Sequence, residues 1–234
     1  MSITVRPSSD RGHANHGWLD SYHTFSFADY HDPAHMGFLD LRVINEDMIE
    51  GASGFPTHGH KDMEIITYMV QGALAHKDST GGEGVIKRGD VQTMTAGQGV
   101  RHSEFNASQT EAARLLQIWV LPQTENLTPT YAQANFTDEE KRNVLRLLVA
   151  PKGKSDGLTI NQDAFLYASL LDAGKSVTHD IKKGRAAWIQ LVDGALSVNG
   201  IEMKTGDGAM AEDVGNLEVT ATTNSEFLLF DLVE

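Results

Sequence analysis

Two short pairs of metal-binding residue types dominate the chemistry of this chain. His58 and His60 stand two residues apart in F-P-T-H-G-H-K, and His102 and Glu104 stand two residues apart in V-R-H-S-E-F. Side chains alternate between the two faces of a β-strand, so each pair would point in one direction. Two neighbouring strands would then aim three imidazoles and one carboxylate at a common point, a donor set that suits a first-row divalent metal. Such a mononuclear site can keep coordination positions open for chemistry.

Apolar runs beside both pairs provide the strands that this geometry needs. The first pair leads into E-I-I-T-Y-M-V-Q-G, residues 64–72, and the second precedes L-L-Q-I-W-V-L, residues 115–121. Short apolar runs that end at glycine or another turn residue are typical of buried strands.

The identity of the carboxylate ligand is open on strand parity alone. Glu64 has the same parity as His58 and His60, so a regular strand would turn it inward as well. We favour Glu104, because it stands two residues from His102 and needs no long regular strand to reach the metal. Glu64 would then be a hydrogen-bonded inner residue or a partner of a ligand.

Two longer spacing patterns resemble a known family. The pattern G-x3-H-x-H-x3-E-x7-G over residues 54–72 resembles the first cupin motif, and G-x5-T-x-G-x4-H-x3-N over residues 89–106 resembles the second. Residues 11–27, 58–68 and 94–104 are similar to the signature blocks of the pirin family and its bacterial quercetinase-type members. The resemblance spans essentially the whole chain.

The resemblance implies a fold, a ligand set and an activity. It implies an all-β chain of two cupin-type antiparallel β-barrels, with His58, His60, His102 and Glu104 as metal ligands. It also implies a quercetin 2,3-dioxygenase-like oxygenase that uses one divalent transition metal ion, dioxygen and a small aromatic substrate. Iron is the first expectation, and nickel, copper, manganese or zinc are alternatives, because ligand type alone does not select the metal. Glu104 would be catalytic if it also takes a proton from the substrate.

A function of another class competes with the enzyme. Eukaryotic pirins are also similar to this chain, and they are described as metal-sensing or redox-sensing cofactors that bind regulatory proteins. In that case the metal would tune a protein-binding surface, and a protein partner would be required. Turnover of a flavonol substrate would distinguish the enzyme from the cofactor.

Composition excludes several other classes. The net charge of -13 disfavours direct binding to nucleic acid, and the absence of cysteine excludes disulfides and thiolate metal sites. The chain shows no signal peptide and no apolar run of about 18 residues, so we expect no membrane span and a cytoplasmic location. Phosphate-loop, dinucleotide-binding and G-x-S-x-G motifs are absent as well.

A weak internal repeat predicts two domains. The run V-Q-G-A-L at residues 70–74 recurs as V-D-G-A-L at 192–196, an offset of 122, and G-D at residue 89 recurs at residue 206, an offset of 117. Turn dipeptides such as N-G and D-G separate many short apolar runs. We predict a metal-binding cupin domain over residues 1–136 and a degenerate cupin domain without metal over residues 137–234. A short helix that Thr137 caps would open the second domain.

The same offsets locate the positions that would correspond to the ligands. Adding 122 to the first pair gives Asp180 and Lys182, and adding 117 to the second gives Val219 and Ala221. These residues could not hold the same metal. His179 is the one histidine of the second half, and we expect it to be a locally bonded residue.

Histidines outside the two pairs have simpler interpretations. His76 shares a strand face with Asp78, and we expect a surface pair in preference to a partner of a ligand. Residues 11–17, which carry two histidines, read as a loop, and the resemblance implies that they line the mouth of the first barrel.

Overall fold

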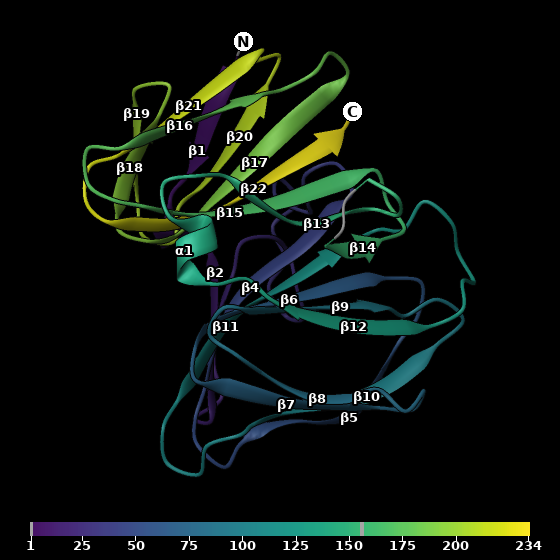
Figure 1. The fold of residues 1–234 in the computed structure, drawn as a ribbon. Coiled ribbons are helices and arrows are strands. Elements are labelled where there is room, and N and C mark those ends of the chain that lie inside the picture. The colour runs from purple at the N-terminus through teal and green to yellow at the C-terminus, as the bar shows by residue number, and fades with distance from the viewer. Residues whose placement is uncertain (1, 155–156) are drawn as a thin grey trace. The chain divides into compact units, whose positions relative to one another are not determined.

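The computed structural model of the chain describes residues 2–154 and 157–234, and nearly all of its regular structure is antiparallel β-sheet (Figure 1). Contacts divide the chain into two compact units that are not contiguous in sequence. The first unit comprises residues 12–135 and 158–162, and the second comprises the described parts of residues 1–11, 136–157 and 163–234. This division differs from a boundary after residue 136 at residues 1–11, 136 and 158–162.

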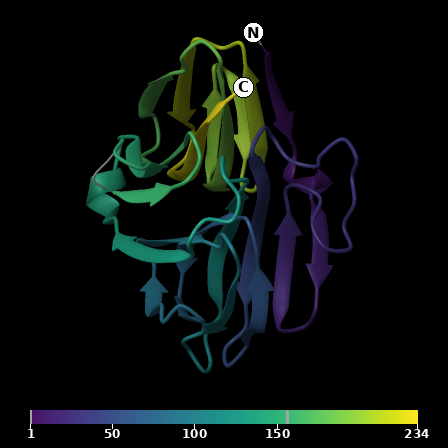
Figure 2. The ribbon, with the colours of Figure 1, turned by 90° about the vertical axis from the view of Figure 1, so that its right-hand side faces the viewer.

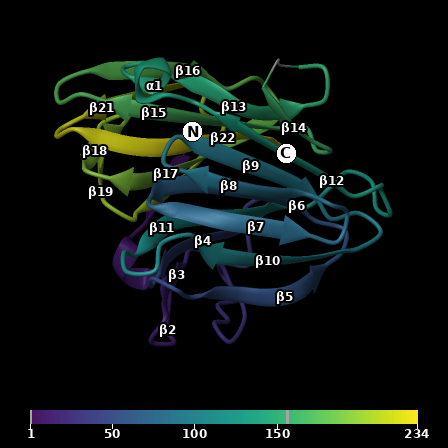
Figure 3. The ribbon, with the colours of Figure 1, turned by 60° about the horizontal axis from the view of Figure 1, so that its bottom comes forward.

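The first unit contains a large and a small sheet. Its strands are β2 (Gly12–Asn15), β3 (Leu19–His23), β4 (Leu41–Ile49), β5 (Gly54–His60), β6 (Glu64–Gln71), β7 (Ala73–Asp78), β8 (Glu83–Lys87), β9 (Asp90–Thr95), β10 (Val100–Asn106), β11 (Ala113–Val120), β12 (Thr130–Asn135) and β14 (Leu158–Ile160). The large sheet has the order β12-β9-β6-β11-β4-β3-β2, and β2 and β3, purple in Figure 2, lie beside β4. The small sheet has the order β5-β10-β7-β8 (Figure 3).

The two sheets of the first unit face each other without closing. No strand pairing among the described residues joins them, and apolar side chains of the two sheets pack against each other instead. Leu74 and Ile86 of the small sheet pack in one fully buried cluster with Met69 and Leu115 of the large sheet. The predicted all-β architecture of antiparallel units is confirmed, and the two sheets stay open and do not close into a continuous barrel. Burial of apolar surface, and not a continuous hydrogen-bond ladder, holds the layers together.

Ten strands of the second unit repeat this arrangement. Its strands are β1 (Ser2–Arg6), β13 (Arg146–Pro151), β15 (Ala164–Leu171), β16 (Ser176–Asp180), β17 (Arg185–Asp193), β18 (Ala195–Val198), β19 (Ile201–Lys204), β20 (Gly208–Glu212), β21 (Asn216–Ala221) and β22 (Ser225–Val233). The order β1-β20-β17-β22-β15-β13 corresponds to β12-β9-β6-β11-β4-β3, and β16-β21-β18-β19 corresponds to β5-β10-β7-β8. Residues 1–11 belong here because β1 pairs with β20, as β12 pairs with β9.

The recurring glycine of the sequence repeat has a structural reason. Gly72 and Gly194 both adopt a left-handed backbone, with φ of 74° and 96°, in the turns that follow β6 and β17. A Cβ atom would lie 2.9 Å from the Cα of Ala113 in the first turn and 2.4 Å from the carbonyl oxygen of Asn224 in the second. Only glycine satisfies both conditions without rearrangement.

Strand register corrects the predicted correspondence between the halves. Leu74 and Leu196 occupy the same place in β7 and β18, and following the pairing across the small sheets matches Glu104 with Val219 and His102 with Leu217. His58 lies opposite His102, and His179 lies opposite Leu217. The counterpart of His58 is therefore His179, and that of His60 is Ile181.

All four predicted assignments were wrong: Asp180, Lys182 and Ala221 are not counterparts of ligands, and Val219 corresponds to Glu104 and not to His102. Turns of different length shift the offset from strand to strand. Three of the four true counterparts are apolar and offer no metal-binding atom. His179, as expected, is locally bonded, with its Nε2 2.8 Å from Oδ2 of Asp231.

The predicted helix is present but short. Helix α1 spans Asp138–Lys141, and Thr137 and Glu140 form the expected reciprocal capping box. None of the described helices is both long and apolar enough to cross a membrane.

Candidate metal centre

The small sheet brings two of the predicted ligands face to face. His58 on β5 lies directly opposite His102 on β10, and their Nε2 atoms are 3.0 Å apart. The Nδ1 atom of His58 lies 2.9 Å from the carbonyl oxygen of Pro56 and donates to it. That bond fixes the tautomer, so the lone pair of His58 is on Nε2 and points toward His102.

His60 completes a cluster of three imidazoles. Ligand nitrogens of His58, His60 and His102 all lie within 4.8 Å of one another. Burial, followed by the nearby His58, lowers the pKa of His60 to about 4. Burial, followed by the three neighbouring histidines, lowers the pKa of His102 to about 3. Both rings are therefore neutral at pH 7, the form that binds a metal.

The dimensions of this cluster fit a transition metal ion. Imidazole nitrogens bind such ions at about 2.1 Å, and at ordinary bond angles two of them are then about 3.0–3.4 Å apart. The separation of 3.0 Å between the Nε2 atoms of His58 and His102 lies in that range. A neutral, three-nitrogen donor set without thiolates suits iron, nickel, copper, manganese or zinc.

A buried chain of side chains orients His102 from behind. Nδ1 of His102 lies 3.5 Å from Nδ1 of His76, and Nε2 of His76 donates to Oδ2 of Asp78 at 3.0 Å. Since that bond places the proton of His76 on Nε2, its Nδ1 can accept from His102, which leaves Nε2 of His102 free for a metal. The expectation that His76 and Asp78 form a surface pair was wrong, because both are buried between the sheets.

Glu104 lies in an adjacent cluster rather than among the three imidazoles. Its carboxylate groups with ligand nitrogens of His76 and His102 within 4.8 Å. Its Oε2 atom accepts a hydrogen bond of 2.9 Å from Nε2 of Gln117, and Nε2 of Gln92 lies 3.5 Å from its Oε1 atom. Burial, followed by the charge of Asp47, raises the pKa of Glu104 to about 7. A carboxyl group with this pKa can take or give a proton at neutral pH.

The alternative carboxylate, Glu64, is engaged elsewhere. Its oxygens accept hydrogen bonds from the Thr95 hydroxyl at 2.9 Å and from the Asn161 amide at 3.2 Å. Among the described residues it is not part of either potential metal-binding cluster. Glu64 is therefore a hydrogen-bonded inner residue, one of the two roles that we expected for it from the sequence.

A cavity of about 770 Å³ opens beside the cluster, within the first unit. His58, His60 and Glu104 line it, and aromatic side chains form part of its remaining walls. The aromatic lining residues are Trp18, Phe27, Tyr30, Phe55 and Trp119. His13 and His16 also line it, as the resemblance implied for the opening block, although His13 lies on strand β2 and not in a loop.

A polar row crosses the large sheet under this cavity. His23, Asn45, Gln117, Thr67 and Gln92 stand directly opposite one another on five adjacent strands. Two members of this row, Gln117 and Gln92, are the amides that contact Glu104. The row was not predicted from the sequence, although β4 carries a usable signal, since three consecutive polar residues, 45–47, interrupt a largely apolar strand.

Comparison with family models covers most of the chain. Residues 4–120 match the family model described as Pirin, and residues 147–232 match the model described as Quercetinase C-terminal cupin domain.

Relatives of similar length match nearly end to end. A protein of Escherichia coli named quercetin 2,3-dioxygenase is 45% identical over 230 residues, which cover 98% of each chain. A pirin-like protein of Caulobacter vibrioides is 37% identical over 98% of this chain and 99% of its own. The solved structure of the bacterial pirin YhhW from Escherichia coli, in complex with nickel(II), is 44% identical, covers 99% of both chains and has a TM-score of 0.94.

Proposed function

Because this chain belongs to the pirin family of two-cupin proteins, we propose that it is a metal-dependent oxygenase that cleaves flavonols with dioxygen, as quercetin 2,3-dioxygenases do. The observation that carries the proposal is the position of His58, His60 and Glu104 on the wall of one aromatic cavity. A flat polyphenol could lie against aromatic walls while one of its hydroxyl groups reaches the cluster.

In this proposal His58, His60 and His102 hold one divalent transition metal ion. Iron is the first candidate, and nickel, which the related YhhW binds, is among the alternatives. The bound ion would supply Lewis acidity, which lowers the pKa of a coordinating hydroxyl group and makes the ring more electron-rich toward dioxygen. Pro56 and His76 keep the ring nitrogens of His58 and His102 in the tautomer that binds metal.

Glu104 acts as the proton acceptor for the substrate hydroxyl. Burial raises the pKa of Glu104 to about 7, so the group is close to the middle of its titration at neutral pH. Gln117 and Gln92 hold its carboxylate in place from the large sheet. The aromatic walls, including Trp18 and Phe55, exclude water from the reacting ring.

Oxygen uptake tests the proposal directly. Metal-free protein is loaded with iron, nickel, copper or manganese in turn, and dioxygen consumption is followed with quercetin. We expect uptake with at least one metal and its loss in His102→Ala. His179→Ala, the equivalent histidine of the second unit, serves as the control and should retain both metal and activity.

Failure has an equally clear meaning. If fully metal-loaded wild-type protein consumes no dioxygen with any flavonol, the enzyme proposal is wrong. Capture of a protein partner that depends on the bound metal would then favour the regulatory cofactor described for eukaryotic pirins.

A further inference from the structure

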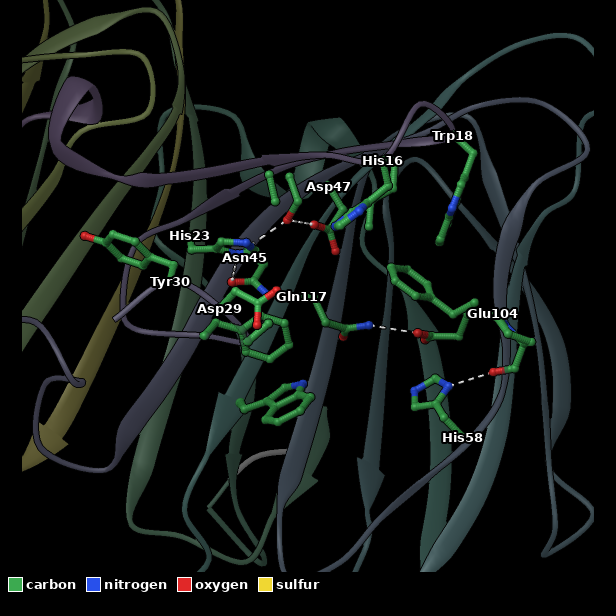
Figure 4. Close-up of a pocket in the computed structure, with 18 of the residues that line it drawn as sticks. His16, Trp18, His23, Asp29, Tyr30, Asn45, Asp47, His58, Glu104 and Gln117 are labelled. Carbon is green, nitrogen blue, oxygen red and sulfur yellow. Dashed lines mark hydrogen bonds between the residues drawn. The ribbon is translucent and has the colours of Figure 1, made fainter. Parts of the chain in front are cut away.

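One end of the cavity carries a compact polar group that the metal cluster does not use. Ser21 on β3 lies opposite Asp47 on β4, and His23 lies opposite Asn45 on the same two strands. All four side chains are buried and line the cavity. Figure 4 shows His23, Asn45 and Asp47 on one side of the cavity, with His58 and Glu104 on the other.

The internal hydrogen bonds of this group use only part of its capacity. The Ser21 hydroxyl donates to Oδ1 of Asp47 at 2.5 Å, and Nδ1 of His23 lies 2.9 Å from Oδ1 of Asn45, to which it donates. Oδ2 of Asp47 and Nδ2 of Asn45 make no hydrogen bond with any other described residue. The cavity wall therefore presents one acceptor and one two-proton donor side by side.

A donor and an acceptor in this arrangement match the chemistry of a phenol. A phenolic hydroxyl can donate to the carboxylate oxygen and accept from the amide, and two adjacent hydroxyls can do both at once. Aromatic rings flank the group: Phe27 and Tyr30 lie 5.4 Å and 6.4 Å from the ring of His23, and Phe27 meets Trp119 edge to face. The carboxylate makes a phosphate or another anion a poor occupant.

We propose that Asn45 and Asp47, with Ser21 behind them, form a subsite that binds the hydroxyl groups of an aromatic ring. This subsite holds the pendant aromatic ring of the substrate, while the opposite end of the molecule reaches the histidine cluster. The inference rests on the proposed function only in taking the ligand to be a polyphenol. It adds a ligand preference: the protein selects molecules whose pendant ring, the ring distant from the histidine cluster, carries hydroxyl groups.

Binding to metal-free protein tests the subsite without any turnover. Two flavones are compared by calorimetry, both without the 3-hydroxyl group, one with two adjacent hydroxyls on its pendant ring and one with none. Wild-type protein should bind the dihydroxylated flavone about tenfold more tightly, the effect of one or two buried hydrogen bonds. Asn45→Leu and Asp47→Leu should each remove most of that preference, with folding checked by circular dichroism.

Two control variants separate the subsite from its surroundings. His102→Ala disrupts the metal cluster and should keep the tenfold preference. Glu83→Gln removes an exposed carboxylate of β8 and should also keep it.

Each outcome bears on the subsite alone or on the proposed function alone. Equal affinity of wild-type protein for the two flavones overturns the subsite, whatever the variants do, and so does a preference that survives both leucine substitutions. If wild-type protein prefers the dihydroxylated flavone but consumes no dioxygen, the subsite is supported and the proposed oxygenase activity is wrong. If it consumes dioxygen but shows no preference, the oxygenase activity is supported and the subsite is wrong.

Discussion

The Nε2 atoms of His58 and His102 lie 3.0 Å apart on directly opposite residues of β5 and β10. This contact holds two neutral imidazoles at the separation that a shared metal ion requires. Glu104, which accepts a hydrogen bond from Gln117 of the large sheet, is not part of the cluster that these two histidines form with His60 among the described residues. The histidines and the carboxylate can therefore be tested separately.

Loss of a single imidazole should abolish metal binding. We expect about one metal ion per chain in wild-type protein and almost none in His58→Ala or His102→Ala, measured by elemental analysis after dialysis. His179→Ala is the matched control, since it removes the counterpart of His58 in the second unit. Equal metal loss in His179→Ala would contradict the assignment of the cluster.

His76 should control the affinity of the cluster without contributing a ligand. His76→Phe keeps a ring in the buried space but cannot accept from His102, so metal affinity should fall about tenfold to a hundredfold. His76→Gln can still accept from His102 and donate toward Asp78, and it should recover part of the loss. Competition with a chelator measures both values. Identical affinities in the two variants would show that His76 only fills space.

Glu104→Gln should show whether Glu104 accepts the substrate proton or serves as a metal ligand. The amide cannot accept the substrate proton, so turnover should fall by at least about a hundredfold while metal content falls only modestly. If metal loss and activity loss run in parallel, Glu104 is a ligand. Glu64→Gln is the control for a second buried carboxylate, and it should affect folding stability more than turnover, because its partners are Thr95 and Asn161.

Asp47 should make the protein less stable as the pH rises through the weakly acidic range. Burial raises the pKa of Asp47 to about 6, above the ordinary value of 3.8, so the folded state binds more protons than the unfolded state between these values. The resulting loss of unfolding free energy is absent below pH 4 and complete above pH 6, where it amounts to about 3 kcal/mol.

The neutral variant Asp47→Asn isolates this effect. Relative to wild type, it should gain about 2–3 kcal/mol of unfolding free energy between pH 4 and pH 7, measured by urea denaturation. A stability difference between wild type and variant that does not change with pH would mean that Asp47 ionises as it would in water.

Features within single strands could be predicted from the sequence. The i, i+2 spacing put His58 and His60 on one face, and His102 and Glu104 on one face, because side chains alternate along any strand. The all-β architecture and the capped helix at Thr137 were also readable, since turn residues, apolar runs and caps act over a few residues.

Relations between strands were decided only by the tertiary structure. The register of β10 against β5 and β7 set His102 opposite His58 and Glu104 opposite His76. It also buried His76, which looked like a surface residue, and moved the counterpart of His58 from Asp180 to His179.

The polar row and the subsite at Asp47 likewise depend on which strands are neighbours in the large sheet. Alternation along a strand follows from the backbone geometry of each residue, so the sequence carries it locally. Register depends on turn lengths and on burial summed over both sheets, and only the folded chain fixes it.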